Sequence, residues 1–224
     1  MAEFQLSLTF ADAPIDQFAR DARGAMSQKE KQGAILFFGK AKCVSCHQVA
    51  GESNEMFSDF RNHVIGVPQI SPLNTNSTFD GPRGNEDFGM EQISGKAADR
   101  YKFRTSPLRN VGLQPTFFHN GAFTRLEDAV AHHLDVWKSA LFYTPVGRLD
   151  ADLAGPTGPT LPVLIRLDEK LRTPIKLTRD EFAQLVAFLR TGLLDERARP
   201  ERLARLIPER LPSELEPLEF EVGD

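Results

Sequence analysis

The stretch "AKCVSCHQV", residues 41–49, contains the only two cysteines of this 224-residue chain. Cys43 and Cys46 are separated by two residues, and His47 follows the second cysteine directly. Because both cysteines are used in one short motif, the chemistry of C-x-x-C-H is the first question that this sequence raises.

Three kinds of site contain a cysteine pair of this spacing. A zinc site needs four ligands, and the chain has no second cysteine pair or Cys-His partner at finger spacing. A redox-active dithiol of the thioredoxin type begins a helix after a buried strand, whereas this pair follows a predicted helix. In covalent haem c attachment, two thiols add to the haem vinyl groups and the adjacent histidine binds the iron. The motif therefore favours haem c held by Cys43, Cys46 and His47, with a dithiol as the alternative.

The composition agrees with a globular haem protein and excludes other classes. Hydrophobic residues make up 41% and charged residues 26% of the chain, which is ordinary for a globular protein. The net charge of −4 argues against nucleic-acid binding. The longest apolar run, "AILFF" at 34–38, is far below the roughly 20 residues of a membrane span. The 17 phenylalanines suit packing around a planar group, although a plain phenylalanine-rich core is the simpler explanation.

Capping patterns predict three helices. A Ser or Thr followed three residues later by Glu is the capping box, and it occurs at Ser27 with Glu30, Thr124 with Glu127, and Thr178 with Glu181. The helix after Thr178 has an apolar stripe of Phe182, Leu185, Val186 and Leu189. Residues 50–120 and 145–175 are rich in turn formers, and no stretch alternates as a strand does. We predict an all-α fold, with helices joined by long ordered loops around one core.

Residues 27–195 form the predicted cytochrome c-like haem domain, and residues 196–224, with four prolines and many charges, are expected to form an extended tail. The opening "MAEFQLSLTFADAP" lacks the basic and apolar regions of a signal peptide. Because haem c is attached outside the bacterial cytoplasm, we expect a periplasmic protein and a chain that is mature or truncated.

Opposite His47, the iron would have a sixth position. The candidate ligands are Met56, Met90, His63, His119, His132 and His133. On the helix that begins near Leu126, helical spacing puts His133 on an apolar stripe running to Trp137 and His132 on the polar face. We therefore predict His133 as the ligand and His132 as a solvent-exposed residue; neither methionine is excluded.

Four stretches make the sequence resemble the bacterial dihaem cytochrome c peroxidases and their MauG-like relatives. They are "GAILFFGKAKCVSCH" (33–47), "GVPQ" (66–69), "DRYKFRTSPLRNVGLQPTFFHNGAFTRLEDAV" (99–130) and "LTRDEFAQLVAFLRTGLLD" (177–195). The resemblance is to the C-terminal haem domain of that family and covers nearly the whole chain. It implies that Cys43, Cys46 and His47 bind an electron-transfer haem.

The same resemblance implies roles for other residues. His133 lies where family members have a distal Met or Tyr. Arg109, Asn110 and His119 resemble residues packed near the haem and its propionates, where Arg109 would neutralise a propionate; the alternative is that they shape the loop. The family also binds Ca²⁺ through carbonyls that correspond to Gln114 and Thr116. Because the rest of that calcium site lies outside this chain, Ca²⁺ is allowed rather than predicted.

Family members carry two C-x-x-C-H motifs, and this chain carries one. Residues 1–26 resemble the connection between the two family domains. The resemblance thus implies an electron-transfer domain that takes electrons from a small cytochrome c or copper protein and passes them to a peroxidatic haem of an N-terminal domain. The alternative is a peroxidase that works at this single haem, with His119 or His63 as the base. Lys40 and Lys42 beside the motif could help to dock an acidic partner or could be merely solvated.

Overall fold

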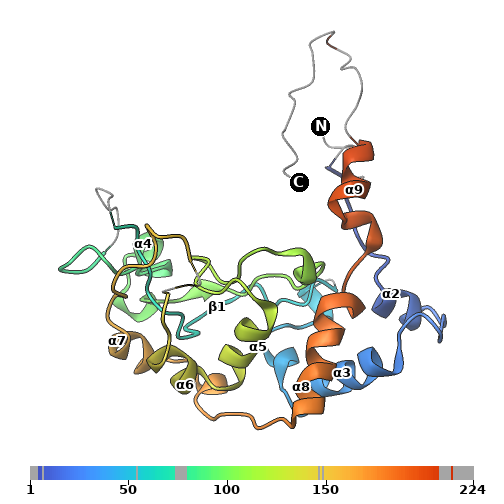
Figure 1. The fold of residues 1–224 in the computed structure, drawn as a ribbon, viewed down its shortest axis with the longest axis horizontal. Coiled ribbons are helices and arrows are strands. Elements are labelled where there is room, and N and C mark those ends of the chain that lie inside the picture. Colours follow the sequence, from blue (N-terminus) through green and yellow to red (C-terminus); the bar gives the residue numbers. More distant parts are fainter. Residues whose placement is uncertain are drawn as a thin grey trace.

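The computed structural model describes residues 5–6, 8–53, 55–73, 80–145, 147, 149–206 and 213. Short helices joined by long loops make up this part of the chain (Figure 1). The α-helices are α2 (Pro14–Ala19), α3 (Gln28–Phe38), α4 (Met90–Ser94), α5 (Leu126–Leu134), α6 (Val136–Leu141), α7 (Leu161–Leu164), α8 (Arg179–Ala187) and α9 (Pro200–Leu203). Single 3₁₀ turns lie at Cys43–Ser45, Gly51–Ser53, Ala97–Asp99, Val111–Leu113, Glu169–Leu171, Glu196–Ala198 and Ala204–Leu206, and a π-helical turn at Phe188–Gly192 continues α8.

Two very short strands depart from the all-helical expectation. β1 (Asn62–His63) and β2 (Phe103–Arg104) pair antiparallel, with His63 opposite Phe103. Each strand has only two residues, so neither is long enough to show the alternation by which a sequence predicts a strand. Among the described helices, none is both long enough and apolar enough to cross a membrane.

Helices α3 and α8 pack against each other and form the main core (Figure 1). Two of the three predicted capping boxes are confirmed: Ser27 caps α3 with Glu30, and Thr178 caps α8 with Glu181. The two helices approach so closely that a Cβ on Gly33 would lie 2.0 Å from a backbone oxygen of α8. Side chains on the apolar face of α8 are buried against α3, as its sequence stripe predicts.

Helix α5 is shorter than expected. Its N-cap is Arg125, with no capping hydrogen bond from a side chain, so the capping box predicted at Thr124 is wrong. The helix ends at Leu134 because Asp135 adopts non-helical dihedral angles (φ −149°, ψ 81°) and its carboxylate accepts from the backbone N–H of Lys138 to start α6. Trp137 therefore leaves the predicted buried stripe and is 36% exposed.

The prediction that His132 faces solvent is also wrong. Its side chain is completely buried. Its ring bonds the carbonyl of Ile65 (2.8 Å) and the hydroxyl of Ser139 (3.0 Å). Helix α5 packs against core on more than one side, because Val130 joins the cluster with α3 and α8 and Ala129 joins a second cluster. A helix surrounded in this way has no purely solvated face, so a polar stripe does not predict exposure.

The segments before and after the predicted domain are folded against it in part. Ala13 and Met26 are buried, and the backbone N–H of Asp12 donates to Asp195 (2.9 Å). The tail is helical, not extended, from Pro200 to Leu206, where proline starts α9 at a position that it favours. Apart from residue 213, the rest of the predicted tail lies outside the described residues, and the domain limits 1–26, 27–195 and 196–224 stay predictions.

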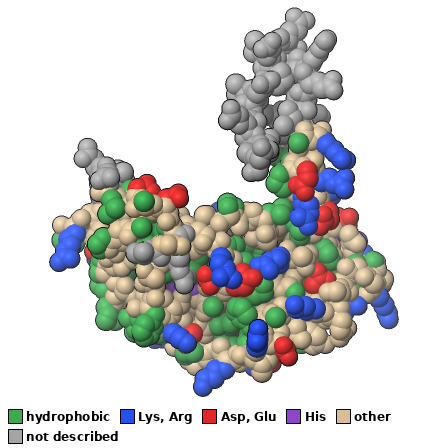
Figure 2. All heavy atoms as spheres, viewed as in Figure 1, with side chains coloured by type: hydrophobic (Ala, Val, Ile, Leu, Met, Phe, Trp, Pro, Cys, Tyr) green, Lys and Arg blue, Asp and Glu red, His purple; other side chains and the backbone are tan. Residues whose placement is uncertain are grey.

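Several large apolar side chains are exposed on and beside α6 and α7. Figure 2 shows hydrophobic side chains gathered on the face over these helices. The residues are Trp137, Leu141, Phe142, Leu161 and Ile165, with exposed fractions from 36% to 80%. The opposite sides of the two helices pack together through Val136, Ala140 and Leu164.

Candidate haem site

The cysteine motif follows α3 after a sharp turn. Lys42 has a left-handed conformation (φ 57°), and the 3₁₀ turn Cys43–Ser45 leads to His47, whose N–H donates to the carbonyl of Cys43 (2.9 Å). This turn brings the two cysteines and the histidine of the motif close together. All three side chains are half-buried.

The electrostatics of the two thiols do not fit a redox-active dithiol. Burial raises the pKa of Cys43 to about 12, and burial also raises the pKa of Cys46 despite the nearby ammonium group of Lys170. Catalytic dithiols have the opposite property, because a lowered pKa provides the reactive thiolate. Among the three alternatives for the motif, the dithiol is thus disfavoured by the structure.

His47 is oriented by one hydrogen bond. Its Nδ1 lies 2.9 Å from the carbonyl oxygen of Phe57. A carbonyl only accepts, so Nδ1 carries the proton of the neutral ring and Nε2 has a free lone pair. Burial, followed by the proximity of His133, lowers the pKa of His47 to about 4, which keeps the ring neutral at neutral pH.

His133 is oriented in the same way from the last turn of α5. Its Nδ1 lies 2.9 Å from the carbonyl oxygen of Ala129, so its Nε2 is also free to bind a metal. The ring stacks on Phe118, with centroids 5.3 Å apart and planes at 22°. Burial lowers the pKa of His133, which favours the neutral form.

The two histidine rings lie close together. Their centroids are 6.2 Å apart and their planes are at 64°. Metal bonds to imidazole nitrogens are about 2.0–2.1 Å long, taking zinc as the guide, so two rings bound to opposite sides of one metal have centroids roughly 6 Å apart. The observed separation therefore fits a single iron between His47 and His133.

The surroundings also fit a covalent haem. The side chains that would hold the haem are each half-buried, which leaves part of their surface accessible to a cofactor; they are Cys43, Cys46, His47 and His133. Cys43 packs against the main core cluster, and so do the partly buried side chains of Val44, Leu108, Phe117 and Leu134. Ligation by His47 and His133, and thioether formation by Cys43 and Cys46, stay predictions.

His132 is next to His133 but has the opposite tautomer. The carbonyl of Ile65 only accepts, so Nε2 of His132 carries the proton and Nδ1 accepts from the hydroxyl of Ser139. Burial lowers the pKa of His132 to about 3. Both ring nitrogens are thus used by protein partners, and neither is free for a metal.

Arg109 and Asn110 form hydrogen bonds with residues of α2, of the loop at Glu55 and of the segment after α8. The guanidinium of Arg109 forms two hydrogen bonds to Asp16, at 2.8 and 2.9 Å, and a third to the carbonyl of Glu55. The side chain of Asn110 accepts from the backbone N–H of Asp195 (2.8 Å). These contacts favour the alternative in which "LRN" shapes the loop, because the Arg109 donors already have a carboxylate partner.

The other candidate histidines have partners of their own. His119 stacks on Phe103 with centroids 3.4 Å apart, lies 3.8 Å from a carboxylate oxygen of Asp87, and has a pKa lowered to about 4, mainly by burial. His63 lies between two carboxylates. Both ring nitrogens of His63 contact carboxylates, so neither is free to bind a metal.

The remaining candidates are placed as follows. Met90 begins α4, and Met56 is a half-buried loop residue whose carbonyl accepts from Leu108. Lys40 forms an ion pair with Glu181 (2.7 Å), while Lys42 is exposed. Of the two lysines, Lys42 is thus the one left for docking a partner.

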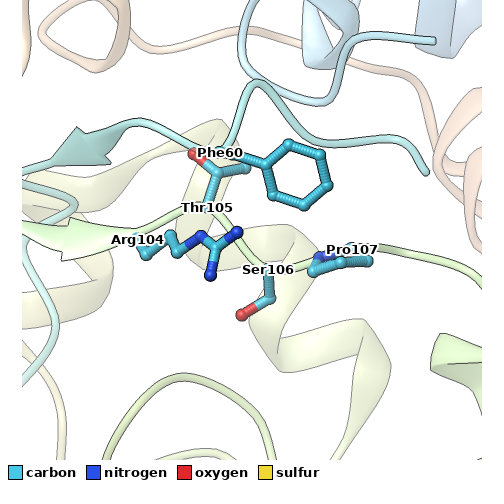
Figure 3. A pocket seen from close by; sticks show the side chains of 5 residues that line it. All are labelled: Phe60, Arg104, Thr105, Ser106 and Pro107. Atoms are coloured by element: carbon cyan, nitrogen blue, oxygen red, sulfur yellow. The ribbon is translucent and has the colours of Figure 1, made fainter. Parts of the chain in front are cut away.

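A surface hollow of about 230 Å³ lies after β2 (Figure 3). It is lined by Phe60, Arg104, Thr105, Ser106 and Pro107, and the Arg104 guanidinium lies 4.8 Å from the centre of the Phe60 ring. None of the motif residues lines this hollow.

Sequence reasoning missed the residues that orient the two candidate ligands. Phe57 and Phe118 both have positive φ, at 58° and 67°, which is unusual for a large side chain. Neither residue carries a sequence signal for this conformation, because bulky residues rarely adopt it. The carboxylates on either side of His63 were also missed, since Asp168 is 105 positions away in the sequence.

A helical domain around a C-x-x-C-H motif, with a second histidine facing that of the motif, defines a cytochrome c-like class of protein. Known proteins agree. The chain is 33% identical over 147 residues to cytochrome-c peroxidase IdrP2 of Pseudomonas sp. (strain SCT). The aligned region covers 59% of this chain and 39% of that protein. It is 30% identical over 134 residues to the methylamine utilization protein MauG of Methylorubrum extorquens, which covers 60% of this chain and 33% of MauG.

Solved structures give the same result for the fold. The crystal structure of the dihaem peroxidase BthA from Burkholderia thailandensis E264 matches with a TM-score of 0.54 and 25% identity, over 93% of this chain and 50% of BthA. No protein-family model matches the chain. The homologues of this chain are dihaem cytochrome c peroxidases and MauG, which confirms the predicted fold class and supports haem c as the cofactor. The chain spans half or less of the length of these three relatives.

Proposed function

We propose that this chain is a c-type haem electron-transfer domain of a dihaem cytochrome c peroxidase-like oxidoreductase. It takes electrons from a small redox protein, a cytochrome c or a copper protein, and passes them to a peroxidatic haem held by another domain. The observation that carries the proposal is the pair of neutral imidazoles, His47 and His133, whose rings lie 6.2 Å apart. The homology to peroxidases supports the same reaction class.

Each residue of the site has one task in this proposal. Cys43 and Cys46 attach the haem through thioether bonds, and His47 and His133 bind its iron through Nε2. The carbonyls of Phe57 and Ala129 hold the Nδ1 protons and so fix both rings in the binding tautomer. The bound haem supplies one-electron redox chemistry.

Electron relay fits these residues better than peroxide reduction at the same haem. A peroxidase needs an open axial position and a nearby base. Here His133 faces His47, and its ring is held by Phe118 and by Ala129. Two imidazoles lack the thioether that raises the potential of many cytochromes, so we expect a lower potential than in a His/Met domain.

The proposal extends to location and partners. Haem c attachment and the periplasmic location of bacterial cytochrome c peroxidases support a periplasmic protein. The relatives are at least twice as long as their matched regions, which supports a second haem domain as the electron acceptor. Ca²⁺ has no role in this proposal.

The axial ligands are tested with the chain produced alongside a c-type haem attachment system. Visible and EPR spectra are expected to give a low-spin centre with two imidazole ligands and one covalent haem. In the variant His133→Ala, the sixth position opens and a high-spin signal appears. The matched control is His132→Ala, which removes the neighbouring histidine and is expected to keep the low-spin spectrum.

Two results would contradict the proposal. A high-spin or His/Met spectrum of the wild-type protein would exclude His133 as the ligand and leave Met56 and Met90 as candidates. Rapid turnover of hydrogen peroxide by the isolated haem-loaded chain, with a reduced donor protein, would favour a single-haem peroxidase. The relay predicts fast oxidation of the reduced donor by the ferric protein without peroxide.

A further inference from the structure

One buried group of charges beside the cysteine motif has no role in the function proposed above. His63 on β1 lies between Asp59 and Asp168: its Nε2 is 2.9 Å from an oxygen of Asp59, and its Nδ1 is 2.7 Å from an oxygen of Asp168. The side chains of Asp59, His63 and Asp168 are 3%, 10% and 22% exposed. We call these three residues the Asp59–His63–Asp168 network.

The geometry of the network indicates its charge. A neutral imidazole carries one proton and can donate to only one carboxylate, which would leave a lone pair pointing at the other. Both contacts are hydrogen bonds only if the His63 ring carries two protons. Burial alone would raise the pKa of Asp59, but hydrogen bonds from the N–H of Arg61 and from His63 lower it. The pKa of Asp168 is also lowered: burial alone would raise it, but hydrogen bonds from His63 and from the N–H of Lys170 lower it. Two carboxylates and one imidazolium give these three residues a net charge of −1, and the ammonium of Lys170 lies next to them at the Asp168 end.

The network is joined directly to the cysteine motif. The backbone N–H of Asp59 donates to the carbonyl of Cys46 (2.8 Å). At the other end, Asp168 caps the turn that carries Lys170, whose ammonium donates to the carbonyl of Ser45 (3.0 Å) and lies 3.5 Å from the sulfur of Cys46. A ligand atom of each of Cys46, Asp59 and His63 lies within 4.8 Å of the others.

We propose that Asp59 and Asp168 are positioning residues that set the reduction potential of the haem through the negative charges of their carboxylates in the Asp59–His63–Asp168 network. The inference rests on the proposed haem site and deepens it. A negative charge that is shielded from water stabilises the more positive, oxidised state of a nearby redox centre. The network therefore holds the potential down and favours donation of the electron to the acceptor haem.

The expected size of the effect follows from Coulomb's law. A unit charge on the order of 10 Å from the redox centre, at an effective dielectric constant of about 20, changes the ratio of oxidised to reduced protein about tenfold. For a one-electron couple this ratio corresponds to about 59 mV. Because the network is largely buried, salt screens the effect only weakly.

Spectroelectrochemical titration of the haem-loaded chain tests the proposal. The variants Asp59→Asn and Asp168→Asn each remove one negative charge and keep an oxygen that accepts a hydrogen bond. Each variant is expected to raise the reduction potential of the haem. At a fixed electrode potential, the ratio of reduced to oxidised protein should then increase about tenfold. Asp168→Glu, which keeps the charge, is expected to keep the wild-type potential.

The matched control is Glu91→Gln. Glu91 is also a carboxylate in an ion pair, with Arg100, but it lies on α4 away from the motif (Figure 1). Its removal is expected to leave the potential unchanged. Nitrogen NMR of the reduced, diamagnetic protein is expected to show protons on both ring nitrogens of His63.

Each outcome decides one question. If the haem attaches with a low-spin spectrum but both Asn variants keep the wild-type potential, the network has only a structural role and the inference is wrong. If Asp168→Glu shifts the potential as much as Asp168→Asn does, loosening of the fold and not charge is the cause, and the inference is also wrong. If one ring nitrogen of His63 has no proton, the charge assignment fails. If no haem attaches at all, the proposed function itself fails.

Discussion

The ion pair of Arg109 with Asp16 gives the sharpest test of how this domain is held together. Both side chains are largely buried, at 9% and 11% exposure, and two parallel hydrogen bonds of 2.8 and 2.9 Å join them. The Arg109 guanidinium also donates to the carbonyl of Glu55 (2.9 Å) and lies over the ring of Phe57. The pair therefore joins α2 to the loop that orients His47.

Removal of either partner leaves a buried charge without its counterion. Breaking a buried ion pair from one side costs about 3–5 kcal/mol. We expect Asp16→Asn and Arg109→Met each to lower the free energy of unfolding by about 3 kcal/mol, the lower end of that range, because both groups keep some contact with water. The double variant is expected to lose little more than either single variant, with a coupling energy of about 2–3 kcal/mol.

Urea unfolding of the haem-loaded protein, followed by circular dichroism, measures the stability of the wild type, the two single variants and the double variant. The visible spectrum is expected to change little in any of the variants, and the double variant, which keeps the net charge of the pair at zero, is expected to keep the wild-type reduction potential. The reasoning is refuted if the two losses simply add, or if Arg109→Met alone changes the potential strongly while Asp16→Asn does not. That second result would show that Arg109 neutralises a haem propionate, the other role considered for it.

Three further perturbations have defined outcomes. Gly33→Ala places a Cβ 2.0 Å from the carbonyl oxygen of Gln184, so it should cost about 3 kcal/mol or more, measured by thermal unfolding against Ala34→Gly as a control on the same helix. Ser27→Ala removes the side-chain acceptor of a confirmed capping box and should cost about 1 kcal/mol in urea unfolding; a loss near zero would mean that the cap contributes nothing. His132 has a folded pKa of about 3, below its ordinary value of about 6.5, so the unfolded state binds the extra proton and stability falls as the pH drops from 7. Between pH 7 and pH 5 the wild type should lose about 2 kcal/mol more than His132→Gln does, and equal losses would contradict the buried neutral ring.

Most local patterns in the sequence predicted what is local in the structure, and the capping box at Thr124 is the exception. The capping boxes at Ser27 and Thr178 depend on atoms three residues apart, and both are present. The C-x-x-C-H motif is equally local, and the structure folds it into a single turn. The apolar stripe of the helix after Thr178 also succeeded, since Leu185, Val186 and Leu189 are buried and Phe182 packs against the same core cluster.

One failure depends on a contact between residues far apart in the sequence, and another on a local signal that the prediction overlooked. His132 is buried because Ile65, 67 positions away, supplies its carbonyl partner. The helix break at Asp135 did have a local signal: aspartate is a poor helix former and a good N-cap, and its side chain does cap α6. Continuing the helical stripe through that residue to Trp137 was the error, since the stripe holds only while the helix is unbroken.

The hydrogen bond between Asp12 and Asp195 brings two points of the chain 183 positions apart into direct contact. Between these points lies nearly the whole folded unit, so the chain enters and leaves it at the same corner. A unit of this kind can be joined in tandem, inserted into a loop of another protein or circularly permuted without stretching its core. Because Asp195 is itself buried and its carboxylate accepts from Asp12, a designer should splice this domain outside that contact, before Asp12 and after Asp195.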